Sequence, residues 1–136
     1  MSGARAFVDT NVIVYAFTND EPEKREIALN FLDTCTPVVS QQVLREFANV
    51  LIKKKSVEVQ AIVNTLREIT QVAELAEEKS SLVYDALGTH EKYGYSFYDS
   101  LIIEAAMTAD CSILLSEDMQ DGQIIGDKLR ITNPFK

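Results

Sequence analysis

Short apolar runs alternate along this chain with longer segments in which apolar residues recur at helical spacing. Apolar and β-branched runs predict short strands at residues 4–8, 37–40, 72–75, 111–116 and 129–135. In the segment 41–55, by contrast, Val43, Phe47 and Leu51 recur every four residues, which predicts an amphipathic helix. Strands that alternate with helices indicate an α/β fold of three α/β/α layers, with a central, mainly parallel sheet of four to five strands.

Further helices are expected between the strands. The apolar spacing and the turn residues place them at 11–17, 18–33, 56–70, 77–94 and 96–110. Asp20 is a candidate N-cap for the helix in 18–33, because Pro22 then falls in its opening turn. Ser56 is the corresponding candidate for the helix in 56–70. No linker, repeat or composition shift interrupts this pattern, so residues 1–136 are expected to form a single domain.

The composition favours a soluble cytoplasmic protein. The two cysteines, Cys35 and Cys111, are too few for a disulfide framework, and neither belongs to a pair at metal-binding spacing. We therefore expect reduced thiols. No apolar stretch is long enough for a signal peptide or for a membrane span of about 20 residues.

The charge balance changes the range of partners to consider. Acidic residues outnumber basic residues 21 to 13, and the formal net charge is -8. A negative protein repels the phosphate backbone of nucleic acids, so bulk electrostatics disfavour such a partner. This argument fails if several acids form one cation-binding pocket, because a bound divalent ion would invert the local field.

Acidic residues stand at the ends of several predicted strands. Asp9 follows the first strand, Glu46 lies in the helix after the second, and Asp99 begins the helix that leads into the run at 111–116. Asp118 follows that run directly. Because functional groups in such folds gather at the carboxyl ends of the strands, we expect these four carboxylates to lie together.

A carboxylate cluster needs a counter-ion, because packed like charges repel one another and raise at least one pKa. Mg²⁺ and Mn²⁺ prefer carboxylate oxygens and keep bound waters that can be activated. Each acid also has a purely structural explanation. Asp9 and Asp99 are candidate helix caps, Glu46 fits a solvated helix face, and Asp118 lies in a generally acidic loop.

Five short motifs are spread over almost the whole chain. They are FVDTNVIVYAF at 7–17, VVSQQVLREFANVL at 38–51, SFYDSLIIEAA at 96–106, ILLSEDMQDG at 113–122 and ITNPF at 131–135. In this order and spacing they resemble the PIN-domain ribonucleases, and among these the VapC-type toxins of prokaryotic toxin–antitoxin pairs. The resemblance implies a metal-dependent endoribonuclease that hydrolyses RNA phosphodiester bonds. It also implies an antitoxin partner and a homodimer.

The resemblance also assigns roles to individual residues. It implies that Asp9, Glu46, Asp99 and Asp118 hold Mg²⁺ or Mn²⁺ and are catalytic. The supporting polar residues that it implies are Asn11, Ser116, Thr10 and Asp121. Because metal-bound water can act as the nucleophile, no catalytic His or Cys is needed. The one histidine, His90, is accordingly expected to be a surface or packing residue.

An acidic ribonuclease still needs a basic route for its substrate. Arg45, Lys53, Lys54 and Lys55, together with Arg67, are candidates for an RNA-binding rim. The aromatic residues Tyr93, Tyr95, Phe97 and Tyr98 could stack on unpaired bases, although aromatic residues near a helix start usually belong to the core.

Three alternatives to a toxin nuclease stay open. PIN domains also serve in RNA processing. A different Mg²⁺-dependent phosphohydrolase would also place an Asp after the first strand, but it needs a second Asp nearby, which the sequence DTNV lacks. A non-catalytic binding module would use the acids only as caps. Such a module would gain little stability from Mg²⁺ or Mn²⁺, whereas an acidic metal site would be stabilised as it fills.

Overall fold

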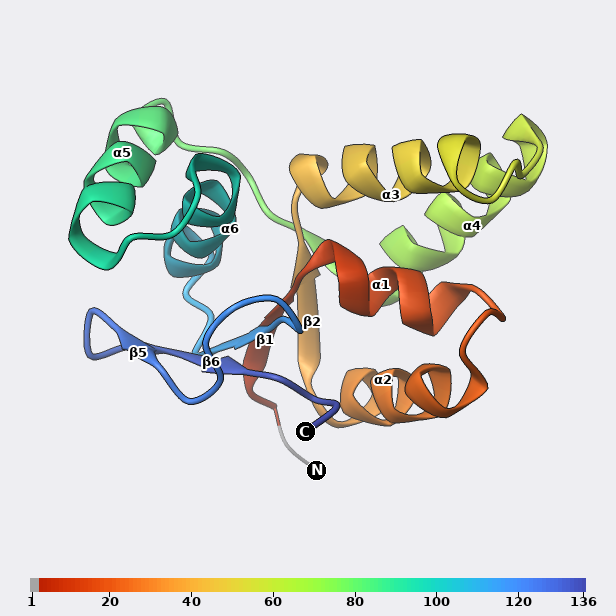
Figure 1. The fold of residues 1–136 in the computed structure, drawn as a ribbon, viewed down its shortest axis with the longest axis horizontal. Helices are drawn as coiled ribbons and strands as arrows, with labels where there is room; N and C mark the ends of the chain where they lie inside the picture. The colour runs from red at the N-terminus through yellow and green to blue at the C-terminus, as the bar shows by residue number, and fades with distance from the viewer. Residues whose placement is uncertain (1–2) are drawn as a thin grey trace.

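The computed structural model describes residues 3–136 and shows an α/β fold built on one six-stranded sheet (Figure 1). The strands are β1 (Arg5–Val8), β2 (Thr36–Val39), β3 (Glu74–Leu75), β4 (Ile113–Leu115), β5 (Ile124–Ile125) and β6 (Leu129–Thr132). Their order across the sheet is β3-β2-β1-β4-β6-β5. All neighbouring strands are parallel except β5, which runs antiparallel to β6. The expected mainly parallel sheet is therefore confirmed.

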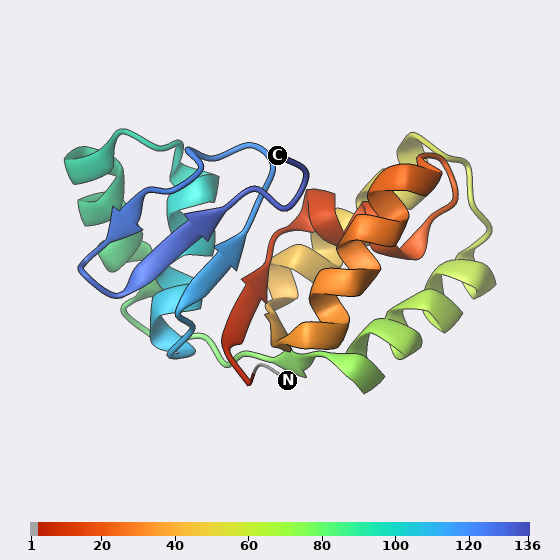
Figure 2. The ribbon, with the colours of Figure 1, turned by 90° about the horizontal axis from the view of Figure 1, so that it is seen from below.

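Within residues 3–136, six helices connect and cover these strands. They are α1 (Thr10–Phe17), α2 (Pro22–Thr34), α3 (Gln41–Lys53), α4 (Val59–Val72), α5 (Leu82–Tyr93) and α6 (Phe97–Thr108). Figures 1 and 2 show α1 to α4 grouped on one side of the molecule and α5 with α6 on the other, with β1 between the two groups. The helices flank a central sheet, as the sequence pattern predicts.

The central strands are apolar because helices cover them. Phe7 and Val8 of β1 are fully buried, as are Val38 of β2 and Leu114 of β4. β1 lies between β2 and β4 and pairs with both in parallel. A parallel strand buried on both faces reads as a continuous apolar run rather than as an alternating one. This explains why residues 5–8 look uniformly apolar after Arg5.

The sheet has one strand more than the sequence predicts. β5 has only two residues and is joined to β6 by a tight turn, in which Lys128 N donates to Ile125 O at 3.1 Å. Gly126 and Asp127, the central residues of that turn, both have positive φ. Such turns suit the twist of a hairpin. The prediction of four to five strands missed β5, whose two residues stand between glycines and polar residues in the sequence DGQIIGDK.

Two predicted helix caps are wrong. Glu21, not Asp20, is the N-cap of α2, and the Asp20 carboxylate instead pairs with Lys55. α4 begins after Glu58, two residues later than an N-cap at Ser56 would give. Ser56 has a φ of 51°, so it belongs to the turn between α3 and α4.

Two further sequence expectations concern membranes and thiols. Among the described residues, no helix combines the length and the apolar character that crossing a membrane requires. Cys35 and Cys111 are both free, as predicted. Burial raises the pKa of the Cys111 thiol to about 11, which makes it a core residue rather than a reactive nucleophile.

Substitutions at the neighbouring residues Leu51 and Ile52 test which face of α3 packs on the core. Leu51 is 3% exposed and Ile52 is 54% exposed, although they are adjacent in α3. We expect Leu51→Ala to lower the free energy of unfolding by about 2–5 kcal/mol, because it opens a cavity in the core. Ile52→Ala should change it by no more than about 0.5 kcal/mol. Urea denaturation of both variants measures this, and equal losses would contradict the described orientation of α3.

Candidate active site

The register of two central strands brings the first pair of site residues together. Val8 of β1 pairs with Leu115 of β4, and the Asp9 backbone N–H donates to Leu115 O at 2.9 Å. Asp9 and Ser116 therefore leave the sheet side by side. The Ser116 hydroxyl donates to Asp9 Oδ2 at 2.8 Å, across a gap of more than one hundred residues in the sequence.

Asp9 serves the helix and the pocket at once. Its Oδ1 accepts a hydrogen bond from Thr10 N at 2.8 Å, so Asp9 is the N-cap of α1. Its side chain is nevertheless one of the few buried charges, at 6% exposure. Burial raises the pKa of Asp9 to about 6, and repulsion from Asp99 and Glu46 acts in the same direction. Hydrogen bonds from Ser116 and Thr10 oppose this rise.

Glu46 reaches the same place from α3. Ser40, the residue after β2, caps this helix by accepting from Val43 N, which fixes where α3 starts. Two turns into the helix, Glu46 Oε1 accepts from the Thr10 hydroxyl at 2.6 Å. Its Oε2 accepts from Gln42 Nε2 at 3.3 Å. Glu46 is therefore held toward α1 rather than toward solvent, which rejects the solvated-face alternative.

Asp99 is not the cap of its helix. Ser96 is the N-cap of α6, and its hydroxyl accepts from Asp99 N at 3.1 Å. Partial burial raises the pKa of the Asp99 carboxyl, and repulsion from Asp118 and Glu46 raises it further. A hydrogen bond with Ser96 acts in the opposite direction. Asp99 therefore faces other acids, which the capping alternative does not explain.

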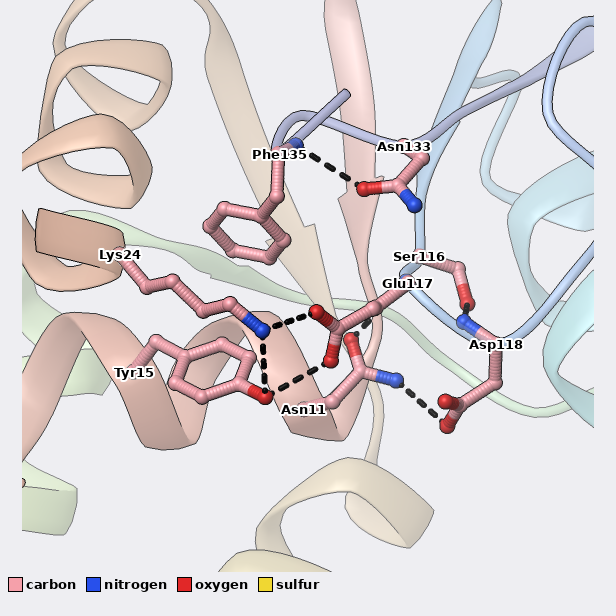
Figure 3. A network of polar contacts seen from close by, with 8 residues as sticks. All are labelled: Asn11, Tyr15, Lys24, Ser116, Glu117, Asp118, Asn133 and Phe135. Atoms are coloured by element: carbon pink, nitrogen blue, oxygen red, sulfur yellow. Dashed lines mark hydrogen bonds and ion pairs between the residues drawn. The ribbon is translucent and has the colours of Figure 1, made fainter. Parts of the chain in front are cut away.

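Asp118 is held by the residue that sequence analysis named as supporting. Asn11 Nδ2 donates to Asp118 Oδ2 at 2.8 Å, while Asn11 Oδ1 accepts from Glu117 N at 3.2 Å (Figure 3). The Ser116 hydroxyl also accepts from Asp118 N at 3.3 Å. One amide side chain and one hydroxyl thus hold Glu117 and Asp118 at the start of the loop after β4.

These four carboxylates line one pocket of about 520 Å³. Its lining consists of Asp9, Thr10, Asn11, Val14, Tyr15, Glu46, Asn49, Val50, Lys53, Lys54, Asp99 and Asp118. Within α3, Glu46, Val50 and Lys53 fall on one helix face, because they are four and three residues apart. Lys53 is seven residues beyond Glu46, which corresponds to a rise of about 10 Å along the helix. The pocket is therefore a groove between α1 and α3 with acids at one end and lysines at the other.

Of the predicted site residues, Arg45, Lys55, Arg67, Ser116 and Asp121 do not line this groove. Ser116 still contacts Asp9, and Arg67 is exposed on α4. Arg45 is exposed on another face of α3, and Lys55 is paired with Asp20 in the α1–α2 connection. Asp121 Oδ1 accepts from Asn133 N at 2.8 Å, so it ties the end of the chain to the loop after β4. Helix periodicity alone would have separated Arg45 from Lys53, whereas the contacts of Lys55 and Asp121 depend on tertiary structure.

Two of the aromatic residues that were predicted to stack on RNA bases make contacts within the protein instead. The Tyr93 hydroxyl accepts from Gly126 N at 3.3 Å, and the Tyr95 hydroxyl contacts Gln123 and Gln120. Tyr93 of α5 and Tyr95 of the α5–α6 connection are therefore bound to the segment around β5. Tyr98 is 64% exposed and remains available for stacking.

The donor chemistry of the pocket suits a hard divalent cation. All four acids supply oxygen, the ligand type that Mg²⁺ and Mn²⁺ prefer, and their mutual repulsion would be relieved by a positive ion. Among the described residues, however, no three His, Cys, Asp or Glu side chains already converge as a metal site. Thr10 and Asn11 hold Glu46 and Asp118 by hydrogen bonds. Each of these bonds uses one oxygen of its carboxylate, so both bonds can persist while the acids draw closer around a cation.

Sequence reasoning missed a polar cluster beside the pocket, made of Tyr15, Lys24 and Glu117 (Figure 3). The Tyr15 hydroxyl donates to Glu117 Oε1 at 2.7 Å, and Lys24 Nζ pairs with Glu117 Oε2. Burial would raise the pKa of Glu117, but the hydrogen bonds from Lys24 and Tyr15 lower it below its ordinary value. Lys24 is 93 residues from Glu117 in the sequence, so no local pattern could have linked them.

Residues 6–120 of the chain match the model of the PIN domain family. The chain belongs to the PIN domain family. This confirms the resemblance seen in the motifs, since four of the five lie within or overlap that range. No curated protein matches the sequence at a significant level.

Solved structures share this PIN fold at low sequence identity. A toxin–antitoxin complex from Klebsiella pneumoniae has a TM-score of 0.71 at 15% identity, covering 95% of this chain and 97% of that one. VapBC2 from Rickettsia felis, bound to a promoter DNA fragment, has a TM-score of 0.67 at 17% identity, covering 95% and 99%. VapC20 from Mycobacterium tuberculosis, a toxin that cleaves the sarcin-ricin loop, has a TM-score of 0.66 at 16% identity, covering 83% and 91%. At these identities the likeness establishes the fold.

The buried charge of Asp9 predicts a pH-dependent stability difference. Its pKa rises from 3.8 to about 6 on folding, which corresponds to about 3 kcal/mol. Well below pH 3.8 the carboxyl is protonated in both states; the penalty is small near pH 4 and grows as the pH rises to about 6. We therefore expect Asp9→Asn to raise the free energy of unfolding by about 1–3 kcal/mol at pH 7 and by little near pH 4.

Urea denaturation without divalent cations, at both pH values, measures this difference. Asp33→Asn, at an exposed site on α2, is the control and should shift stability by no more than about 0.5 kcal/mol. A destabilised Asp9→Asn variant at pH 7 would contradict the prediction, because it would mean that the cap and the Ser116 contact outweigh the cost of burial.

Proposed function

We propose that this PIN domain is a divalent-metal-dependent endoribonuclease that acts as the toxin of a toxin–antitoxin pair. The observation that carries the proposal is the meeting of Asp9, Glu46, Asp99 and Asp118 in one pocket at the carboxyl edge of the sheet. They come from four separate segments of the chain. Stability alone does not favour this arrangement, because burial and mutual repulsion raise the pKa of two of these acids.

A bound Mg²⁺ or Mn²⁺ ion would supply an activated water and stabilise the negative charge that develops on a cleaved phosphodiester. The four carboxylates would hold this ion. Ser116 and the Thr10 backbone orient Asp9, and Asn11 orients Asp118, through the hydrogen bonds already described. Among the residues that the structure describes, none that lines the pocket is His or Cys, so the proposed chemistry relies on oxygen ligands alone.

The groove between α1 and α3 suggests how RNA approaches an acidic protein. Lys53 and Lys54 line the end of the groove opposite the carboxylates. Between these ends lie Val14, Asn49 and Val50, which offer apolar contact and one amide. We infer that one phosphate meets the acidic end while a neighbouring phosphate meets the lysines. This places the substrate strand along the two helices.

The toxin role is supported by the fold neighbours. One similar structure is a toxin–antitoxin complex and another is VapBC2 on its promoter DNA. We propose that a cognate antitoxin covers the groove of this chain, that the protein acts in the cytoplasm, and that it forms a homodimer. RNA processing by the same chemistry is the second candidate, and the test of the nuclease site below is common to both.

Asp99→Asn tests the nuclease site. We expect the variant to fold and to lose roughly 100-fold or more of its cleavage rate, because the amide fits the space but binds a divalent cation poorly. The assay is cleavage of a mixed, partly single-stranded RNA pool by antitoxin-free protein with Mg²⁺, Mn²⁺ or a chelator. Asp121→Asn, outside the groove, is the control and should stay active. Full activity of Asp99→Asn, or cleavage in chelator, would contradict the proposal.

The basic end of the groove gives a separate prediction. In an Asp99→Asn background, which binds without cutting, Lys53→Met should weaken RNA binding and reduce the slope of log K against log salt by about 0.7. Lys55→Met is the matched control, because Lys55 is engaged with Asp20 outside the groove. Fluorescence anisotropy over a salt series measures both slopes. Equal changes in the two variants would show that the RNA does not follow the groove.

A further inference from the structure

The cluster of Tyr15, Lys24 and Glu117 joins three segments that are distant in the sequence (Figure 3). Tyr15 comes from α1, Lys24 from α2, and Glu117 from the loop after β4. Both oxygens of the Glu117 carboxylate are engaged, one by the Tyr15 hydroxyl and the other by Lys24 Nζ. Lys24 Nζ also lies 3.3 Å from the Tyr15 hydroxyl. The loop is therefore attached to both helices at a single side chain.

The end of the chain closes this cluster from the other side. The Phe135 ring meets the Tyr15 ring edge-on, with ring centroids 5.1 Å apart. Lys24 Nζ lies 4.6 Å from the centroid of the Tyr15 ring and 5.3 Å from that of Phe135, within the range of cation–π attraction. Lys24 and Glu117 are each no more than about one-third exposed. This ion pair is thus better enclosed than an ordinary surface pair.

The attached residue is the immediate neighbour of a site carboxylate. Glu117 precedes Asp118, and Asn11 binds the backbone N–H of the first and the carboxylate of the second. Among the described residues that line the groove, Asp118 is present and Glu117 is not. The cluster therefore turns one acid of this pair away from the groove while its neighbour faces into it.

We propose that Lys24 is a positioning residue for the cation site: by anchoring Glu117 it fixes the loop from which Asp118 reaches the groove. The inference rests on the proposed function, because it concerns the same carboxylates. Lys24 does not line the groove, and it is linked to Asp118 through its ion pair with the preceding residue, Glu117. The role differs from simple stabilisation, since it sets where Asp118 stands relative to Asp9 and Asp99.

The test removes the anchor without changing the local charge. Lys24→Met alone would delete a positive charge near the site and so favour cation binding by electrostatics, which would mask a loss of positioning. The double variant Lys24→Met with Glu117→Gln keeps the sum of the two charges at zero. We expect it to bind Mn²⁺ about tenfold more weakly, in the range found when residues that orient metal ligands are replaced. Lys24→Arg should keep the affinity of the original protein.

The readout is the free Mn²⁺ signal in electron paramagnetic resonance, measured on purified protein without RNA. Lys128→Met with Asp110→Asn is the matched control, because it removes another ion pair, at residues that precede β4 and β6 rather than follow them. Circular dichroism checks that each variant is folded at the temperature of measurement. If the double variant does not fold, Tyr15→Phe removes one hydrogen bond to Glu117 and should still weaken Mn²⁺ binding.

Each outcome decides a different claim. If the original protein binds Mn²⁺, Asp99→Asn weakens it, and the double variant binds as tightly as the original with only a lower melting temperature, the positioning role is overturned and the proposed function stands. If the original protein binds no Mn²⁺ at millimolar concentration, both are overturned. A loss confined to the Lys24–Glu117 double variant, with the control unchanged, supports the inference.

Discussion

The buried carboxylate of Asp9 is the constraint on which this site depends. It stands where β1 ends and α1 begins, so it cannot move without disturbing the start of the helix. Ser116 reaches it because β1 and β4 are paired in register. A charge in this position is costly, and burial together with the neighbouring acids raises the pKa of Asp9 to about 6. The paired strands therefore fix the position of Asp9, although burying its charge there is unfavourable.

Glu46 and Asp118 accept hydrogen bonds from neutral side chains of α1 rather than from Lys or Arg. Thr10 binds Glu46 and Asn11 binds Asp118, so residues of one helix start restrain acids from two other segments. A hydroxyl and an amide can be displaced by a metal ion at modest cost, whereas a lysine among the acids would compete with that ion for them. This choice of partners keeps the pocket negative, which is the property that a cation site needs.

Acidic and basic side chains occupy different places in and around the groove. Lys24 neutralises Glu117 beside the groove, and Lys55 is engaged with Asp20 at the α1–α2 connection. Lys53 and Lys54 stay at the open end of the groove. The overall charge of -8 therefore says little about the field that a substrate would meet there. The local order of acids and lysines along α3 matters more, and helix periodicity sets that order.

The fold class, and the expectation that four acids lie together, could be predicted from the sequence, because buried strands, amphipathic helices and charges at strand ends leave local signals. Asp9 and Asp118 stand out in apolar sequence for this reason. Which polar groups hold these acids emerged only in the tertiary structure. It excluded Lys55 from the groove and introduced Lys24, since both outcomes depend on partners that are distant along the chain. Local patterns record burial and periodicity, whereas the pairing of distant side chains is set when helices pack on the sheet.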